Sequence, residues 1–256
     1  MRLSLLASGS KGNAIYVESG ETRLLIDAGL TAVELSRRLD QIGVPAASLH
    51  AILVTHEHQD HVGGAGTLAR RLKIPVVMSY PTHRVTASTL RKVSVVEFET
   101  GYPFCFRDLL IDPFSITHDA VDPVAFVLES REGRLGVATD LGVVTGLVRE
   151  KLKGCRLLVM ESNHDEEMLA NGPYPWHLKQ RIRSRHGHLS NTDSAALVQE
   201  LLHPQLAGIF LAHLSEVNND PELARRVTSE VIESCSSSAP ALFVGNQYAP
   251  SELFEQ

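Results

Sequence analysis

Thr55-His56-Glu57-His58-Gln59-Asp60-His61-Val62-Gly63-Gly64 concentrates metal-ligand residues directly after a short apolar run. Short apolar runs bounded by polar residues are typical of strands buried on both faces. His56 and His58 lie two positions apart, so in an extended segment both side chains point the same way and can share a metal ion. Asp60 and His61 fall where the chain turns into a helix predicted over 62–72, and they can face a second ion. The two glycines that follow relieve crowding where the backbone approaches this site.

Three further apolar runs are each followed by a metal-ligand residue: His118 after 114–117, Asp140 after 136–139 and His213 after 209–212. In open α/β sheets, the loops at the carboxyl ends of the strands converge on one crevice. Packing alone does not explain why separate strands each deliver an imidazole or a carboxylate to that edge. Borderline divalent ions favour such ligands. We therefore expect two ions, one held by His56, His58 and His118, the other by Asp60, His61 and His213, with Asp140 bridging them.

The composition is that of an ordinary globular protein with one exception, its 12 histidines. The 256 residues are 43% hydrophobic and 21% charged, which excludes disordered and fibrous classes. No linker-like tract divides the chain, so we expect one domain over residues 1–256. The net charge of −6 argues against a protein coated in basic charge but leaves room for a local basic patch.

The sequence also bears on the cellular setting. No apolar run approaches the roughly 18–20 residues that a membrane helix needs, and the first residues turn polar too soon for a secretory leader. Cys105, Cys155 and Cys235 are odd in number and far apart, so they predict neither a disulfide framework nor a CxxC metal site. We therefore expect a protein of the reducing cytoplasm that makes no membrane contact. The sequence carries no signal for a protein partner or an oligomeric state.

Strand and helix signals alternate along the chain. Segments 3–7, 14–18 and 23–26 are β-prone, and short apolar runs follow at 51–54, 75–78, 135–138, 157–160, 208–212 and 241–244. Helical spacing covers 32–42. Start signals at 190–192 and 220–222 predict further helices over 193–202 and 221–232. Strands first and mixed βα units later predict a layered α/β or α+β architecture.

The HxHxDH run at 56–61, followed in order by His118, Asp140 and His213, resembles the metallo-β-lactamase fold superfamily of metallo-hydrolases. Four further phrases, at 6–13, 161–165, 187–191 and 212–216, are similar to its YycJ/WalJ-type branch, near the tRNA 3′-processing endonuclease-like phosphodiesterases. The resemblance implies a four-layer αββα sandwich with a dinuclear metal site. It also implies a nuclease-like phosphodiesterase activity on DNA or RNA.

The chemistry that fits two bound cations is hydrolysis by a metal-bridged hydroxide, because two ions lower the pKa of a shared water towards neutrality. Asp60, besides binding metal, can orient the attacking hydroxide. Ligand histidines need a partner on their second nitrogen, and Thr55, Thr117 and backbone carbonyls are the candidates. Histidine and aspartate ligands suit zinc, manganese and iron alike, and no cysteine favours one of them.

Further residues are candidate substrate contacts near the metals. The 8–13 segment reads as a tight turn between strands rather than a nucleotide loop, although Ser8, Ser10 and Asn13 can still hold a phosphate. His188 matches a histidine element of the tRNA-processing relatives, so we expect it to stabilise the phosphorane charge or to protonate the leaving oxygen. Asn163 and His164 follow another buried run and reach the same edge, either as substrate contacts or as structure.

The chain has no acidic residue between 169 and 192, and this stretch holds Lys179, Arg181, Arg183 and Arg185. On a helix these side chains form two basic faces. Because the stretch leads into His188, we expect a surface that binds a nucleic-acid backbone. Trp176 and Tyr174 beside it can stack on a base, although a buried anchor for the loop is the favoured interpretation.

The leading hypothesis is a metal-dependent nuclease, most simply an exonuclease acting on DNA. One alternative is a small-molecule hydrolase of the thioesterase or lactonase type, which typically lacks the His188 element and a basic approach. Another is a non-catalytic regulatory protein with structural metals. The seven candidate ligands argue against that reading, because a closed structural site needs four.

Overall fold

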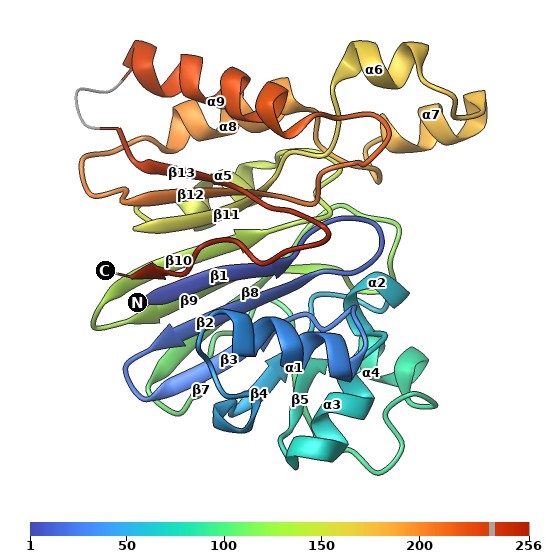
Figure 1. Cartoon of the computed structure of the whole chain (residues 1–256), viewed down its shortest axis with the longest axis vertical. Coiled ribbons are helices and arrows are strands. Elements are labelled where there is room, and N and C mark those ends of the chain that lie inside the picture. The colour runs from blue at the N-terminus through green and yellow to red at the C-terminus, as the bar shows by residue number, and fades with distance from the viewer. Residues whose placement is uncertain (236–238, 256) are drawn as a thin grey trace.

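The apolar runs assemble into two β-sheets that pack face to face in the computed structural model, which describes residues 1–235 and 239–255 (Figure 1). The first sheet contains β1 (Arg2–Ala7), β2 (Ala14–Ser19), β3 (Thr22–Ile26), β4 (Ala51–Leu53), β5 (Val76–Ser79), β6 (Val95–Phe98) and β14 (Phe254–Glu255). Within the described residues its strand order is β14-β1-β2-β3-β4-β5-β6. Strands β3 to β6 run parallel to one another, so their carboxyl ends share one edge.

The second sheet is built on the same plan. It contains β7 (Phe104–Phe106), β8 (Leu109–Ser115), β9 (Val124–Ser130), β10 (Gly133–Ala138), β11 (Leu157–Glu161), β12 (Gly208–Ala212) and β13 (Ala241–Val244). Its order over the described chain is β13-β12-β11-β10-β9-β8-β7. Strands β10 to β13 are parallel, and β7 to β10 pair antiparallel.

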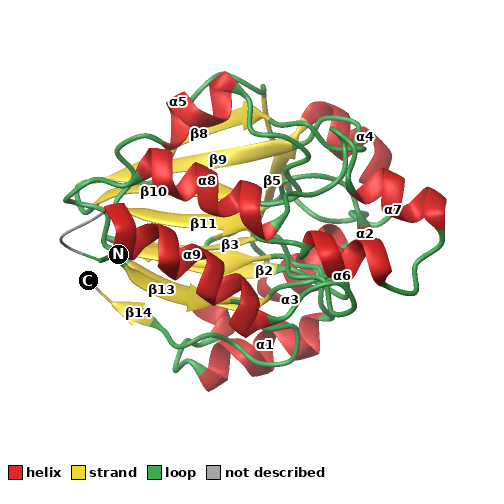
Figure 2. Ribbon diagram, turned by 90° about the horizontal axis from the view of Figure 1, so that it is seen from above, coloured by secondary structure: helices red, strands yellow, loops and turns green. Residues whose placement is uncertain are grey.

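Helices cover the outer face of each sheet (Figures 1 and 2). On the first sheet lie α1 (Ala32–Gln41), α3 (Ala65–Leu72) and α4 (Tyr80–Thr86), with the short α2 (Gln59–Val62) at the edge and a 3-10 turn at Ala46–Ser48. On the second lie α5 (Gly146–Leu152), α8 (Asn191–Leu201) and α9 (Pro221–Cys235). The remaining helices, α6 (Glu166–Asn171) and α7 (Trp176–Ile182), project beyond the strand ends. The layers form the expected four-layer αββα sandwich.

The strands are buried on both faces, as their continuous apolar runs predict. In β3, Leu24 faces the second sheet, whereas its neighbour Leu25 packs under α1 and α3. In β11, Val159 faces the first sheet, and Leu158 packs under α5 and α8. This alternation places one apolar core between the sheets and one under each helical layer.

The helix predicted over 62–72 is two helices, α2 and α3, separated by Gly63 and Gly64. The Gly64 N–H donates to the carbonyl of Ala28 over 2.7 Å, and a Cβ at Gly64 would lie 1.8 Å from the Leu30 carbonyl oxygen. The backbone approach predicted for these glycines is therefore present, and it is also the reason that the helix breaks. Among the described residues, no helix is long and apolar enough to cross a membrane.

Candidate metal centre

Sharp turns at the strand ends aim side chains at one edge of the molecule. Asp27 follows β3, Asp140 follows β10 and His213 follows β12, and their φ angles are 62°, 55° and 57°. Left-handed backbone is uncommon outside glycine, although aspartate and histidine are enriched there, and it costs of order 1–3 kcal/mol. Each turn bends the chain at the carboxyl end of a parallel strand, so these three side chains meet where the two sheets share an edge.

His56, His58 and His118 come together as predicted. Each offers a ring nitrogen, and these nitrogens lie within 4.8 Å of one another. Nε2 of His118 is 3.3 Å from Nδ1 of His58, and the rings of His56 and His58 stand edge to face with centroids 4.6 Å apart. Three imidazoles that face one point can hold a divalent ion.

Asp60, His61 and His213 form the adjacent group, again with ligand atoms within 4.8 Å of one another. Oδ2 of Asp60 is 3.5 Å from Nε2 of His61 and 3.7 Å from Nε2 of His213. Asp140 lies between the two groups, with Oδ2 3.2 Å from Nε2 of His61 and Oδ1 3.7 Å from Nε2 of His118. The structure thus brings all the predicted ligand residues into one cluster.

The donor atoms of this cluster fit divalent cations. Nε2 of His56, Nε2 of His213 and Oδ2 of Asp140 are buried and make no hydrogen bond to any residue that the structure describes. A buried polar atom without a partner costs about 1–3 kcal/mol, and bound cations would satisfy all three atoms. Burial lowers the pKa of His56 well below its usual value, which keeps this imidazole in the neutral form that binds metal.

Carboxylates and imidazoles shift one another's pKa values in this site. Burial raises the pKa of Asp140. His213 and His61 lower this pKa by a larger amount, so the net pKa is well below its usual value. Burial lowers the pKa of His213, but Asp140, Asp60 and Glu161 raise it to about 10. The potential that stabilises a proton on His213 equally favours a metal cation at the same place.

Asp27 orients a ligand histidine, and sequence reasoning missed it. Its Oδ2 lies 2.7 Å from Nδ1 of His61, which turns Nε2 towards the cluster. The Thr55 hydroxyl donates to Oδ2 of Asp27 over 2.9 Å. Oγ1 of Thr55 also lies 3.0 Å from Nδ1 of His56. Thr55 is therefore the partner of a ligand histidine that the sequence predicts. Asp27 directly follows a predicted strand, the same signal that identified His118, Asp140 and His213.

Glu161 was missed in the same way, although it ends a predicted apolar run. It is fully buried, and Oε1 lies 2.8 Å from Nδ1 of His188 and 2.8 Å from Nδ1 of His213. Oε2 accepts the backbone N–H groups of Leu141 and Leu189. Glu161 thus joins a candidate catalytic histidine to a candidate metal ligand.

Of the three kinds of partner predicted for the ligand histidines, Thr117 is the one that makes no hydrogen bond to a ligand histidine among the described residues. Its hydroxyl accepts the Val143 N–H over 3.1 Å, because the loop after β10 folds back against it. The second nitrogen of His118 faces the Gly187 carbonyl at 3.4 Å instead. A backbone carbonyl therefore takes the place expected for the threonine.

The 8–13 segment is the predicted tight turn between β1 and β2, and it braces the metal ligands. Ser8 Oγ accepts the His213 N–H over 2.5 Å, and Asn13 Nδ2 lies 3.0 Å from Nε2 of His61. Both side chains are buried. Ser10 is exposed and faces a cavity beside His188. Of the three phosphate contacts predicted in this turn, Ser10 is the one that solvent reaches freely.

The residues after β11 differ in their surroundings. His188 lies beside the ligands, with its ring centroid 5.3 Å from that of His118 and 5.1 Å from that of His213. Asn163 donates Nδ2 to the His213 carbonyl and lines the same cavity as Ser10. His164 is buried, its backbone bridges to Ser190, and burial lowers its pKa to about 4. These contacts favour a structural interpretation of His164.

The basic stretch is only partly helical, because α7 ends at Ile182 and the chain turns so that the His188 N–H donates to the Ile182 carbonyl. Lys179 donates to the Ala170 carbonyl over 2.7 Å, and Arg181 Nε donates to Asp119 over 2.7 Å. The exposed side chains of Arg183 and Arg185 make no ion pair or hydrogen bond within 1–235 and 239–255. These two arginines are the free cations of the stretch.

Trp176 is 69% exposed at the start of α7, so the interpretation of this tryptophan as a buried anchor is wrong. The loop is held without it: Gly172 approaches Asn218 closely, and Lys179 ties α7 to the end of α6. The exposed indole is free to contact a ligand.

Two helix-covered sheets with histidines and carboxylates clustered at their common edge define a metallo-hydrolase of the metallo-β-lactamase fold. The chain belongs to the β-lactamase superfamily, since the model of the beta-lactamase superfamily domain matches residues 22–209.

Known proteins of the same class are similar over most of their length. Exodeoxyribonuclease YycJ of Bacillus anthracis is 37% identical over 236 residues, which cover 91% of this chain and 89% of that protein. Exodeoxyribonuclease WalJ of Streptococcus pneumoniae serotype 2 (strain D39) is 38% identical over 228 residues, 87% of this chain and 85% of that one. The crystal structure of the metallo-β-lactamase fold protein YhfI from Bacillus subtilis has a TM-score of 0.76 at 16% identity, covering 100% of this chain and 99% of that chain.

Proposed function

We propose that this protein is a metal-dependent phosphodiesterase that hydrolyses nucleic acid, and specifically an exonuclease acting on DNA. The observation that carries the proposal is the convergence of seven candidate ligands with a Glu161-paired His188 at one sheet edge. The names of the relatives YycJ and WalJ, both exodeoxyribonucleases, support DNA as the substrate. The proposal treats residues 1–256 as one metallo-hydrolase domain that acts in the cytoplasm.

The proposal includes two divalent ions, zinc, manganese or iron. His56, His58 and His118 would hold one ion, and Asp60, His61 and His213 the other. Asp140 would bridge them, which its two oxygens support because Oδ1 faces His118 and Oδ2 faces His61. When bound, such ions lower the pKa of a water molecule towards neutrality and neutralise phosphate oxygens.

His188 is the proposed proton donor to the leaving oxygen. Its Nδ1 is held by Glu161, so Nε2 is the nitrogen left to face the substrate. The Glu161 carboxylate on Nδ1 fixes the orientation of the ring, so that a proton on Nε2 would point towards the leaving oxygen. Asp60 has a second role, to orient the attacking nucleophile from its place between His61 and His213.

The proposed substrate contacts are the residues that line the cavity beside His188 and the arginines after α7 that have no partner within the described residues. Ser10 and Asn163 line the cavity beside His188, and the unpaired Arg183 and Arg185 offer charge to the phosphate backbone. Ser8, Asn13, Lys179 and Arg181 act mainly by supporting the site, because their polar atoms are engaged within the protein. His164 is the weakest contact, since it is buried beneath this surface.

The test compares wild-type protein with His61→Ala and Asp60→Ala on end-labelled single- and double-stranded DNA, with Zn²⁺, Mn²⁺ or Fe²⁺ added. We expect both variants to lose at least about 100-fold in activity, because each removes one of the candidate ligands of the proposed second ion. His83→Ala is the matched control, since His83 is a partly exposed histidine that pairs with Glu97.

Undiminished nuclease activity in a folded His61→Ala protein would overturn the proposal. Circular dichroism and the melting temperature verify that each variant folds. Labelled RNA and chromogenic thioesters and lactones are the comparison substrates. Faster turnover of an ester than of DNA by the wild-type protein would favour a small-molecule hydrolase instead.

A further inference from the structure

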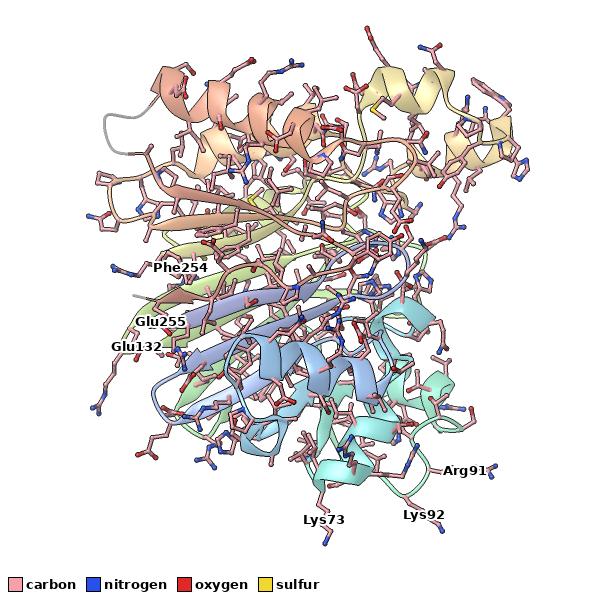
Figure 3. The ribbon with its side chains drawn as sticks, in the orientation of Figure 1. Lys73, Arg91, Lys92, Glu132, Phe254 and Glu255 are labelled. Atoms are coloured by element: carbon pink, nitrogen blue, oxygen red, sulfur yellow. The ribbon has the colours of Figure 1, made fainter. Side chains whose placement is uncertain are left out.

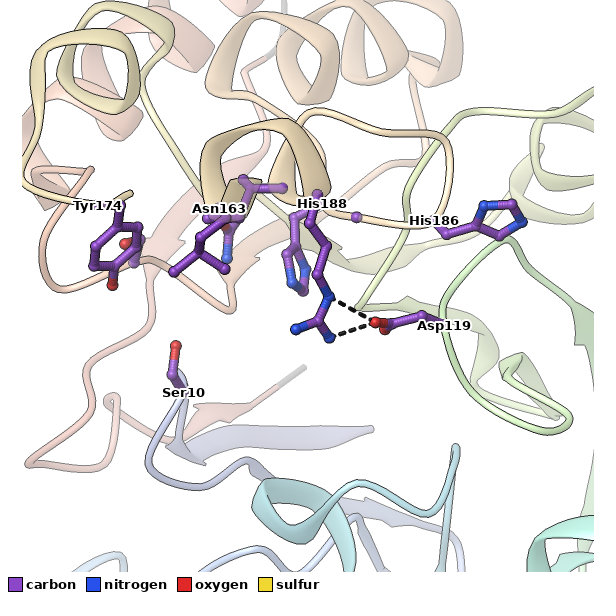
Figure 4. Close-up of a pocket in the computed structure, with 11 residues that line it drawn as sticks. Ser10, Asp119, Asn163, Tyr174, His186 and His188 are labelled. Carbon is purple, nitrogen blue, oxygen red and sulfur yellow. Dashed lines mark hydrogen bonds and ion pairs between the residues drawn. The ribbon is translucent and has the colours of Figure 1, made fainter. Parts of the chain in front are cut away.

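A cavity of about 170 Å³ adjoins the metal centre on the side of α7 (Figure 4). One wall is apolar and comes from the projecting helical segment: Tyr174, Leu178 and Ile182. Polar lining comes from the loops next to the metal ligands: Ser10, Asn163 and Ser215. Asp119, Arg181, His186 and His188 also line the cavity, so most of its surface is polar and the aromatic and aliphatic side chains form one patch of it.

His188 connects this cavity to the reacting centre. It lines the cavity, and its ring lies 5.3 Å from that of His118 and 5.1 Å from that of His213. A group bound in the cavity is thus next to whatever occupies the metal centre. For a phosphodiester held at the metals, the neighbouring group is a nucleotide of the same strand.

The charges of the cavity argue against a second phosphate. Arg181 is its one arginine, and Asp119 already pairs with it, as the dashed lines in Figure 4 show. The pair is neutral, and among the described lining residues there is no lysine; the other basic side chains are those of His186 and His188. A phosphate would have to displace the Asp119 carboxylate, whereas a neutral flat group needs no unpaired cation.

Tyr174 supplies the surface that such a flat group requires. Its ring lies at one side of the cavity, on the same side of the view as Ser10 and across from His186 and Asp119 (Figure 4). The side chain is half-buried, and its hydroxyl has no hydrogen-bond partner within the described chain. A tyrosine that packs without a polar partner at a cavity wall is available for stacking, and every nucleobase has a π-face to offer.

We propose that this cavity binds the base of a nucleotide flanking the scissile phosphodiester, stacked on Tyr174, and that Tyr174 thereby selects nucleic acid over small esters. The inference rests on the proposed nuclease function. The edge groups of the base would meet Ser10, Asn163 and Ser215, which suit any base, so the cavity favours a base without favouring one sequence.

The experiment pairs removal of the tyrosine with removal of the base. Wild-type protein, Tyr174→Ala and Tyr174→Phe act on an end-labelled oligodeoxynucleotide, and on two copies that are abasic at the terminal or the second nucleotide. We expect one abasic copy to be cut about 10-fold less efficiently in kcat/KM by the wild-type protein, within the range measured for base stacking. On the intact strand, Tyr174→Ala should have the kcat/KM that the wild-type protein has on that abasic copy. Removing the base should then cause no further loss in Tyr174→Ala. Tyr174→Phe should keep the wild-type preference, because the ring remains.

The outcomes separate the two proposals. If the wild-type protein cuts no oligonucleotide with any added metal, the nuclease function fails and this inference fails with it. If the wild-type protein cuts DNA but Tyr174→Ala slows intact and abasic strands equally, or slows neither, the nuclease function stands and the base site is wrong. Leu147→Ala, which truncates an exposed side chain on α5, controls for the loss of a surface apolar group.

Discussion

Glu161 is the residue on which both the proposed proton donor and a candidate metal ligand depend. Burial raises its pKa, but His188 and His213 lower it to about 2, so the carboxylate is charged across the neutral range. We expect Glu161→Gln to lower nuclease activity and metal affinity by about 10- to 100-fold, because both imidazoles lose the charge that orients them. Steady-state rates and metal content by mass spectrometry measure the two effects.

The control for Glu161→Gln is Glu129→Gln, which changes an exposed glutamate on β9. The glutamine side chain in Glu161→Gln has nearly the same shape as the glutamate. The melting temperature of Glu161→Gln should therefore show whether the buried network is still intact. Wild-type activity in Glu161→Gln would contradict the role given to the Glu161–His188 pair.

Glu18 makes a separate residue-scale prediction, about acid stability. Burial raises its pKa, but hydrogen bonds from Tyr16, Arg2 and Arg23 lower it more, so the net pKa is below its usual value. A carboxyl with a depressed folded pKa stabilises the fold above its unfolded pKa of about 4.3, and this contribution is lost as pH falls through the folded pKa. Glu18→Gln should therefore be less stable than wild type at neutral pH, and the difference should shrink below about pH 4.

Urea unfolding of both proteins between about pH 7 and pH 3 tests this, with the exposed Glu21→Gln as the control. A stability difference between wild type and Glu18→Gln that stays constant over this range would show that the charge of Glu18 does not matter.

Ligand-type residues directly after predicted strands indicate most of the metal cluster, but this rule was not used for every strand. The rule that identified His118, Asp140 and His213 also covers Asp27 and Glu161, which follow predicted strands. Their partners could not be predicted, because the contacts of Asp27 with His61 and of Glu161 with His188 join segments about 30 positions apart that only the fold brings together. The partner of Thr117 could not be predicted for the same reason.

At the scale of elements, the buried strands and the capped helices are confirmed. Ser190 caps α8 through the Asp193 N–H, and Pro221 begins α9. Much of 80–130 was not predicted, because β6 to β8 carry exposed positions and their pattern is neither continuous nor strictly alternating. Short helices such as α6 were missed because a helix this short relies on tertiary contacts rather than on sequence propensity.

The segment after α7 makes the element-scale prediction. Arg183→Ala combined with Arg185→Ala should weaken DNA binding uniformly across sequences and reduce the slope of log K against log salt by about 2, one unit for each lost phosphate contact. Fluorescence anisotropy over a salt series measures both quantities. Arg91→Ala is the matched control, because Arg91 is exposed at the end of the molecule away from α7 (Figure 3). An unchanged salt slope in the double variant would exclude this surface from backbone binding.

At the scale of the whole molecule, the metal centre joins the two halves of the sandwich. His56, His58, Asp60 and His61 follow β4 of the first sheet. His118, Asp140 and His213 follow strands of the second sheet. Each proposed ion therefore has ligands from both sheets. The pairing of the sheets could not be predicted from local patterns, but the order of the ligand residues along the chain, matched to a known family, indicated it.

Metal removal should consequently destabilise the whole fold. An ion that binds the folded state but not the unfolded state adds about 2.7 kcal/mol to the free energy of unfolding at a concentration 100 times its Kd. Chelation should therefore lower the melting temperature by about 5–10 °C. Scanning calorimetry of the wild-type protein with and without a chelator measures the shift, and added Zn²⁺ or Mn²⁺ should restore it. His61→Ala should respond less, because it has lost a ligand of one of the two proposed ions. A wild-type melting temperature that ignores both chelator and metal would mean that these residues do not hold cations between the sheets.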